Sequence, residues 1–191
     1  MYRFVFGFWL WIGVSTGYSQ TGEELARLAE TLEDSSVRYV AGYVSIPYPL
    51  GDVPAKTGVC TDVVIRAFRL IDIDLQQAVH EDMKANFSMY PKLWGLSTTD
   101  KNIDHRRVPN LMTYFDRQGW TIHTSDSLHH FQPGDVVAWD LGSGLTHIGI
   151  VTSKRGKNGR PLVIHNIGGG QTLEDILFDF EVIGHYRLST D

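Results

Sequence analysis

The chain has 191 residues, the length of one compact domain with at most a short appendage. Its hydrophobic (42%) and charged (20%) fractions are those of a globular protein, which excludes a disordered or multi-span membrane chain. A net charge of −5 with no basic block argues against a nucleic-acid partner. The single cysteine, Cys60, excludes an intramolecular disulfide and any multi-cysteine metal site.

Residues 1–19 have the layout of a secretory signal. Arg3 precedes an apolar run over residues 4–14, and the small residues Gly17 and Ser19 fit a cut before Gln20. The run is far shorter than the ~20 residues that span a bilayer. We therefore expect a signal peptide over 1–19 and a single exported domain over 20–191, periplasmic or extracellular, with no stable membrane span after processing. An uncleaved N-terminal anchor is the alternative.

The first half of the domain is predicted to be helical. Apolar residues at helical spacing indicate four helices, over residues 22–38, from Cys60 to about 71, 75–87 and 109–118. A capping-box pattern over residues 21–24 marks the start of the first helix. The first turn of the second helix holds Cys60, Thr61 and Asp62, and Pro109 is expected at position N1 of the fourth.

The pattern becomes extended after Gly119. Five strands are expected over residues 120–124, 135–141, 147–153, 162–167 and 182–188. Residues 156–159 read as a hairpin tip, and the proline- and glycine-rich residues 39–58 read as an ordered loop. Helices followed by a strand meander predict an α+β fold, with N-terminal helices packed on a C-terminal antiparallel sheet or partial barrel.

Cys60 is the candidate nucleophile. Free N–H groups and the dipole at a helix N-terminus favour negative charge, so a thiolate with a pKa below the free value of about 8.5 is expected. Exported proteins seldom keep an unpaired thiol without a use, and Gly58 leaves room for a substrate two positions before Cys60. A buried structural cysteine is the alternative reading.

A thiol nucleophile needs a base and a group that orients the base. His147 opens an apolar strand and His165 interrupts the next one, so pairing of the two strands would bring both imidazoles together. Consecutive strand residues point to opposite faces, so only one of His165 and Asn166 can face His147. We expect His165, with Asn166 as the alternative third residue. Zinc held by His147, His165 and His185 would leave Cys60 unexplained, and no metal or organic cofactor is expected.

Three segments together resemble the NlpC/P60 cell-wall peptidases of the papain-like superfamily: GVCTD opening a helix, then PGDVVAWDLGSGLTHIGIV, then LVIHN. The family's order of cysteine, histidine and polar residue falls on Cys60, His147 and His165. More closely, YPLGDVP, GVCTDVVIRAFR, NIDHRRVPNL, HIGIV, HNIGGG and GHYRL together resemble the bacterial family called domain of unknown function 1287, over residues 39–188. The resemblance implies a papain-like fold and a hydrolase acting on peptidoglycan stem peptides.

The departures from the NlpC/P60 pattern concern the substrate. Those enzymes usually read DCSG where this chain reads VCTD, so the subsite beside the thiol, which includes Asp62, should differ. The NIDHRRVPN insertion adds Arg106 and Arg107, whose fork geometry suits a carboxylate. A solvated pair, or a salt bridge to Asp100 or Asp104, is the alternative.

These residues together predict an exported cysteine hydrolase. Cys60 attacks an amide carbonyl, its backbone N–H helps to hold the oxyanion, His147 acts as base and then acid, and His165 orients His147. Tyr43, in the loop before the nucleophile, is a candidate for substrate or oxyanion contact, with a packing role as the alternative. The expected partner is peptidoglycan or a peptide. The rival functions are a thiol acyltransferase or amidase on a non-wall substrate, and a non-catalytic cell-wall binding domain.

Overall fold

The computed structural model describes residues 17–122 and 130–189. The elements in chain order are α1 (Gly17–Glu30), β1 (Arg38–Tyr39), β2 (Thr57–Gly58), α2 (Cys60–Arg69), α3 (Leu75–Ala85), the 3-10 turns η1 (Phe87–Met89) and η2 (Asp104–Arg106), α4 (Val108–Arg117), β3 (Val136–Asp140), β4 (Thr146–Arg155), β5 (Pro161–His165), β6 (Thr172–Glu174) and β7 (Glu181–Tyr186). The expected order of helices followed by strands is confirmed.

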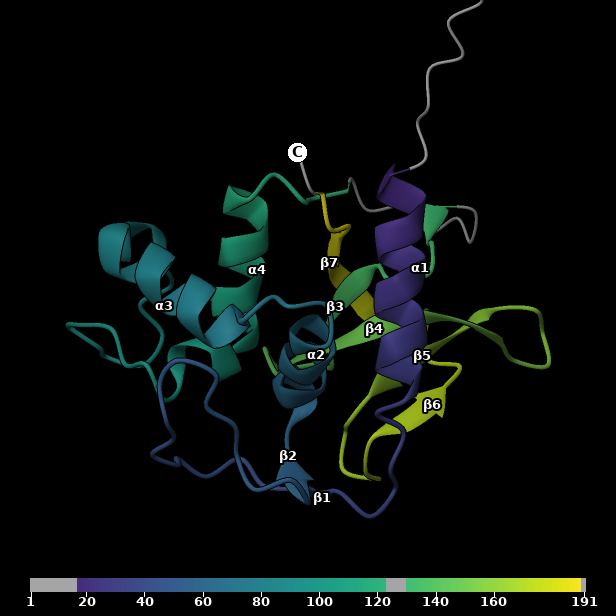
Figure 1. The fold of residues 1–191 in the computed structure, drawn as a ribbon, viewed down its shortest axis with the longest axis horizontal. Helices are drawn as coiled ribbons and strands as arrows, with labels where there is room; N and C mark the ends of the chain where they lie inside the picture. The colour runs from purple at the N-terminus through teal and green to yellow at the C-terminus, as the bar shows by residue number, and fades with distance from the viewer. Residues whose placement is uncertain (1–16, 123–129, 190–191) are drawn as a thin grey trace, which may run out of the picture.

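The sheet is antiparallel throughout, with strand order β6-β5-β4-β3-β7. Helices α1, α2 and α4 contact its central strand β4, and α3 lies outside them against α4 and η2 (Figure 1). The short strands β1 and β2 pair in parallel at the end of α2 that carries its N-terminus (Figure 1). This arrangement is an α+β fold in which one helical layer covers one face of the sheet.

The helices differ from the predictions mainly at their ends. The chain is already helical at Gly17, so residues 21–24 lie inside α1 and the predicted capping box is wrong. That helix ends at Glu30 rather than near residue 38, because Asp34 pairs with Gln171 through two backbone hydrogen bonds of 2.8 and 3.0 Å. This long-range pairing outweighs the local helical pattern. Helix α4 begins one residue early, which puts Pro109 at N2 instead of N1.

Four of the five predicted strands are present, as β3, β4, β5 and β7, with ends shifted by one or two residues. The fifth prediction, over 120–124, is reduced to a single bridge between Thr121 and Tyr186, and its last two residues lie outside the described residues. The predicted hairpin tip joins β4 to β5, with Gly159 at φ +73°. Strand β6 was missed because three half-buried residues give too short a pattern, and β1 and β2 lie at the ends of the predicted loop.

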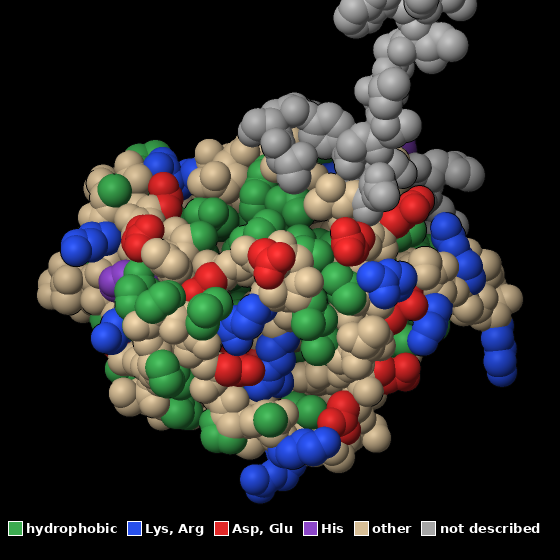
Figure 2. All heavy atoms as spheres, viewed as in Figure 1, with side chains coloured by type: hydrophobic (Ala, Val, Ile, Leu, Met, Phe, Trp, Pro, Cys, Tyr) green, Lys and Arg blue, Asp and Glu red, His purple; other side chains and the backbone are tan. Residues whose placement is uncertain are grey.

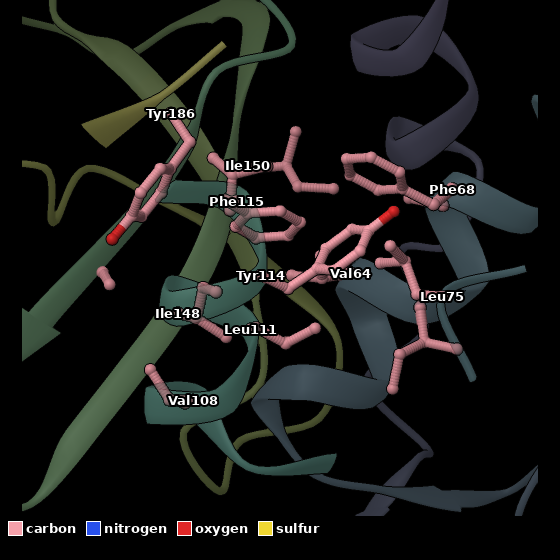
Figure 3. Close-up of a cluster of buried hydrophobic side chains, with 14 of the residues drawn as sticks. Val64, Phe68, Leu75, Val108, Leu111, Tyr114, Phe115, Ile148, Ile150 and Tyr186 are labelled. Atoms are coloured by element: carbon pink, nitrogen blue, oxygen red, sulfur yellow. The ribbon is translucent and has the colours of Figure 1, made fainter. Parts of the chain in front are cut away.

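Side chains of the sheet alternate between two hydrophobic clusters. On β3, Val136 and Ala138 join the helix-side cluster, whereas Val137 and Trp139 join the second cluster on the opposite face. Figure 3 shows the helix-side cluster, in which Ile148 of β4 lies among side chains from α4 and α2. The hydrophobic cluster that a strand residue joins therefore shows which face of the sheet its side chain lies on.

Most of the predicted signal segment, residues 1–16, lies outside the described residues, and residues 17–19 belong to α1. Among the described residues, no helix is both long enough and apolar enough to cross a membrane. On the face drawn in Figure 2, basic and acidic side chains are interspersed. Neither sign of charge forms a continuous patch on that face.

Candidate active site

Cys60 is the first residue of α2, as predicted. The helix starts here because Val59 is extended and the Asp62 carboxylate accepts the Val59 N–H at 2.6 Å, which closes the first turn. The Cys60 side chain is 5% exposed and is a free thiol. A polar cap made by Asp62 therefore fixes where the thiol sits.

Cys60 lines a cavity of about 320 Å³, the Cys60 cavity. Its walls come from four parts of the chain: the end of β1, the N-terminus of α2, the segment leading into α4, and the turn before β4 (39, 41, 59–61, 94, 103, 106–109, 145 and 146). The last of these residues, Thr146, immediately precedes His147 in β4. The cavity thus connects the candidate nucleophile with the strand that carries the candidate base.

His147 and His165 meet as predicted. Their Nε2 and Nδ1 atoms are 3.0 Å apart, and both residues are almost fully buried. Gly149, between them in the sheet, makes this approach feasible, because a Cβ at that position would lie 2.7 Å from Val163 and 3.1 Å from the His165 Cβ. Trp139 stacks on the His147 ring, with centroids 5.8 Å apart. The first imidazole is therefore held by a ring and by a second imidazole.

Glu174 of β6 is a third member of this chain of groups and was missed in the sequence. Its Oε2 lies 3.2 Å from His165 Nε2, but off the N–H axis, so the contact is that of a nearby charge rather than an aligned hydrogen bond. The only sequence signal was a glutamate three residues after Gln171, in a strand too short to recognise. Glu174 raises the pKa of His165, although burial leaves that pKa lowered overall.

Burial sets the protonation states of the candidate pair. Burial raises the pKa of Cys60 to about 11, and hydrogen bonding from the backbone of Ile148 and Thr61 lowers it only in part. This is opposite to the expected thiolate, because desolvation outweighs the helix N-terminus. Burial, with a smaller contribution from the His165 charge, lowers the pKa of His147 to about 3. At neutral pH the site therefore holds a thiol and a neutral imidazole.

The Cys60 thiol and the His147 imidazole lie on different faces of the sheet. Cys60 belongs to the helix-side cluster with Ile148, whereas His147 stacks on Trp139 of the second cluster. The backbone of Ile148, the residue after His147, hydrogen-bonds the sulfur. No hydrogen bond joins Cys60 to either imidazole in the part of the chain that the structure describes. The Nδ1 atom of His147 is likewise left without a hydrogen bond to the described residues.

Arg106 and Asp62 form a buried, two-pronged ion pair, with Nε to Oδ1 at 2.9 Å and Nη2 to Oδ2 at 3.0 Å. The Arg106 carbonyl accepts a hydrogen bond from Thr61 at 3.2 Å. The predicted alternative of a salt bridge from this arginine pair to Asp100 or Asp104 is wrong, because Arg106 pairs with the Asp62 carboxylate that caps α2 and Arg107 forms no ion pair with the described residues. These contacts fasten the loop before α4 to the helix that carries Cys60.

Three other candidates have different surroundings. Arg107 lines the Cys60 cavity and lies over Trp94, 4.1 Å from the ring centre. Asn166 does not face His147, and its side chain accepts the Gly168 N–H at 3.0 Å, the turn expected from the sequence. Tyr43 is 60% exposed and bonds to residues of the 100–102 loop, beside a separate cavity of about 550 Å³. The structure therefore does not bring Tyr43 to the thiol.

His185 is bound by a carboxylate instead of joining the other two histidines. Its Nε2 lies 2.6 Å from Asp135, which also accepts two hydrogen bonds from Arg187, at 2.7 and 2.8 Å. Within residues 17–122 and 130–189, no three His, Cys, Asp or Glu side chains are grouped as ligands of a metal ion. The geometry does not assemble the three-histidine zinc alternative.

The architecture is papain-like α+β, as the resemblance implied. Among solved structures, an N-acetylmuramoyl-L-alanine amidase from Bacteroides uniformis ATCC 8492 has a TM-score of 0.52 at 12% identity, over 89% of this chain and 100% of that chain. NlpC1 from Trichomonas vaginalis has a TM-score of 0.46 at 17% identity, over 94% of this chain and 47% of that chain. This chain thus spans about half the length of NlpC1. At these identities the likeness concerns the fold.

The chain belongs to the family described as domain of unknown function (DUF1287), which matches residues 26–188. It is also similar to Uncharacterized protein YijF of Escherichia coli (strain K12), with 53% identity over 153 residues, covering 80% of this chain and 75% of YijF. The resemblance predicted over residues 39–188 is therefore confirmed, and the match also covers part of α1.

Proposed function

We propose that this protein is an exported cysteine hydrolase that cleaves an amide bond in the stem peptides of peptidoglycan. The observation that carries the proposal is the placement of the Cys60 thiol on the wall of a cavity, against the peptide unit that follows His147. The His147 Nε2 atom is held by His165 Nδ1 at 3.0 Å. A nucleophile, a base and an orienting group are the three parts that thiol hydrolysis needs.

His165 and Glu174 favour particular proton positions on the imidazoles of the site. The Glu174 carboxylate favours a proton on His165 Nε2, which leaves His165 Nδ1 as the acceptor. His147 then carries its own proton on Nε2, and its Nδ1 lone pair is free to act as a base. Glu174 and His165 thus select the tautomer of His147 that can take a proton from a thiol.

The reaction starts from the neutral pair. The sulfur and the imidazole lie on different faces of the sheet, so the His147 ring must first turn toward Cys60. As the Cys60 sulfur then attacks the amide carbonyl, its proton passes to His147 Nδ1, and the backbone N–H of Cys60 stabilises the oxyanion. The imidazolium then gives the proton to the leaving amine as the C–N bond breaks, which yields a thioester. Water, deprotonated by His147, hydrolyses the thioester and restores the thiol. Because the thiol and the imidazole are both neutral beforehand, the proton moves from sulfur to His147 during the attack itself.

Two further observations support the substrate class. The fold is similar to that of a protein whose name is N-acetylmuramoyl-L-alanine amidase, which cleaves an amide of peptidoglycan. The cavity is lined mostly by apolar and aromatic side chains with a few polar groups, which suits a peptide. Export is supported by the signal-like pattern of residues 1–19.

Digestion of purified sacculi tests the proposal. The chain from residue 20 onward should release fragments whose masses identify one cleaved amide bond, and Cys60→Ala should fold normally and release none. Cys60→Ser is a second control, because it keeps the size of the side chain but not the thiol. Release by the Cys60→Ala protein, or no release by the unaltered protein, would contradict the proposal.

A further inference from the structure

Arg106 and Arg107 are neighbours in the chain with contrasting surroundings. Arg106 is bound on two sides by Asp62. Arg107 makes no hydrogen bond or ion pair with the described residues, and its Nη1 is buried without a partner. A buried guanidinium N–H without an acceptor costs free energy, which a bound acceptor would recover. Arg107 therefore points to something that binds in the Cys60 cavity.

Trp94 holds the Arg107 guanidinium in an orientation that suits binding of an acceptor in the cavity. The guanidinium carbon lies 4.1 Å from the centre of the Trp94 ring, and both residues line the cavity that contains Cys60. Stacking on a ring restricts the guanidinium to one plane while leaving its edge free for hydrogen bonds. The edge of a guanidinium matches the two oxygens of a carboxylate.

The rest of the cavity also favours an anion. The N-termini of α2 and α4 both open on it, and helix dipoles stabilise negative charge at these ends. The Asp62 carboxylate at the start of α2 is paired with Arg106. Asp104 is engaged by His80, at 3.3 Å, and by the backbone N–H of Asp100. Arg107 thus stacks on Trp94 but forms no hydrogen bond or ion pair with a carboxylate of the described residues, although the Asp104 and Asp100 charges partly offset the lowering of its pKa by burial.

We infer that Arg107 binds a carboxylate of the substrate close to the amide that Cys60 attacks. The enzyme then selects peptides with a free carboxylate beside the scissile bond over peptides in which that group is an amide. This inference rests on the proposed function and narrows its substrate to an acidic peptide. Arg106 does not share the role, because its Nε and Nη2 donate to Asp62 and its Nη1 to the Gly42 carbonyl.

Two matched probes test the inference: a disaccharide-peptide fragment released from sacculi by a muramidase, and the same fragment with its carboxyl groups converted to carboxamides. The unaltered protein should show a kcat/KM ~10- to 100-fold higher for the acidic fragment. Arg107→Gln should lose this preference, hydrolysing both fragments at about the lower rate. Arg107→Lys should keep part of it, because it retains the charge but not the fork.

Arg27→Gln is the matched control, because Arg27 is 66% exposed on α1 and takes no part in the cavity. It should keep the full preference. An unchanged preference in Arg107→Gln, with thermal unfolding like that of the unaltered protein, would overturn the inference.

Binding separates this result from failure of the proposed function. With Cys60→Ala, calorimetry should show tighter binding of the acidic fragment than of its amidated form, and the difference should vanish when Arg107→Gln is added. If the unaltered protein cleaves neither fragment, the hydrolase proposal fails and this binding difference alone decides the inference. Equal binding of the two fragments, or no binding of either, overturns it.

Discussion

Two buried polar clusters lie beside the second hydrophobic cluster, and they are built differently. His147 and His165 bond to each other, and the nearest carboxylate, Glu174, is 43% exposed and off the axis of the hydrogen bond. Asp135, in contrast, is fully buried and contacts both His185 and Arg187 at 2.8 Å or less. In the first cluster the imidazoles bond to each other and to no buried carboxylate, whereas in the second the Asp135 carboxylate is fully used, although His185 Nδ1 has no hydrogen bond to the described residues.

We interpret this difference as that between a candidate catalytic site and a structural cluster. A fully bonded carboxylate between two basic groups fixes backbone positions, here the turn before β3 and the strand β7. A neutral imidazole pair that is not bonded to a buried carboxylate fixes geometry while leaving a proton acceptor, His147 Nδ1, available. We therefore expect substitutions in the first cluster to change catalysis and substitutions in the second to change stability.

The largest expected effect is that of His147→Gln on turnover. Removing the base should lower kcat by about 10⁴-fold, while chemical denaturation at pH 7 shows a native-like protein. The measurement is hydrolysis of the disaccharide-peptide fragment, with His80→Gln as a control outside the pair. If the variant is unfolded and its folded fraction keeps normal activity, His147 has a structural role like that of the Asp135 cluster.

Asp135→Asn should have the largest effect on stability. It leaves His185 and Arg187 without their carboxylate, and loss of one member of a buried ion pair costs about 3 kcal/mol of the free energy of unfolding. Urea unfolding measures this, and kcat of the remaining folded protein should stay within a few-fold. A large loss of kcat with an unchanged free energy of unfolding would show that the Asp135 cluster also acts in catalysis.

Acid should destabilise the protein through the first cluster. The folded-state pKa of His147 is about 3, against about 6.5 when unfolded, so only the unfolded state gains a proton as the pH falls through 6.5. Between pH 6.5 and pH 4 this group alone should cost about 3 kcal/mol. Urea unfolding at both pH values should show that the His147→Gln protein loses about 3 kcal/mol less of its free energy of unfolding than the unaltered protein. His105, whose pKa burial also lowers to about 3, contributes equally to both proteins. An identical loss in the two proteins would contradict the buried neutral state of His147.

His165→Ala should lower kcat by roughly 10- to 10⁴-fold, less completely than loss of Cys60, because the nucleophile and base remain. Asn166→Ala is the matched control, since its side chain bonds to Gly168 in the turn and not to His147. If Asn166→Ala were the crippled variant and His165→Ala kept near-normal turnover, the third residue of the site would be Asn166.

Glu174→Gln should have the smallest effect, a decrease in kcat of about tenfold, because the carboxylate acts on His147 only through His165. Its neighbour Asp175, which pairs with Arg160, gives a control in Asp175→Asn. The kcat of the Glu174 variant should fall while KM stays unchanged. A rise in KM alone would instead indicate substrate contact.

Sequence reasoning was most successful where motif and periodicity agree. Cys60 at a helix start and His147 beside His165 were predicted, because strand alternation fixes which side chains share a face. The raised pKa of the thiol was not, because burial depends on packing around Ile148 that no local pattern records. Glu174 was missed because a strand of three residues carries no usable period, and the Asp62 to Arg106 pair because its members are far apart in the chain.

The site also draws on parts of the chain that are made at different times. Cys60 belongs to the first third of the sequence, whereas β4 and β5, with both histidines, come after residue 145. A chain emerging from a ribosome or a channel N-terminus first exposes its thiol long before its base, and pairing of such distant segments is slow to form. The proposed hydrolysis could therefore not begin before nearly the whole domain has emerged and the sheet has formed, because the order of the elements along the chain brings the base last.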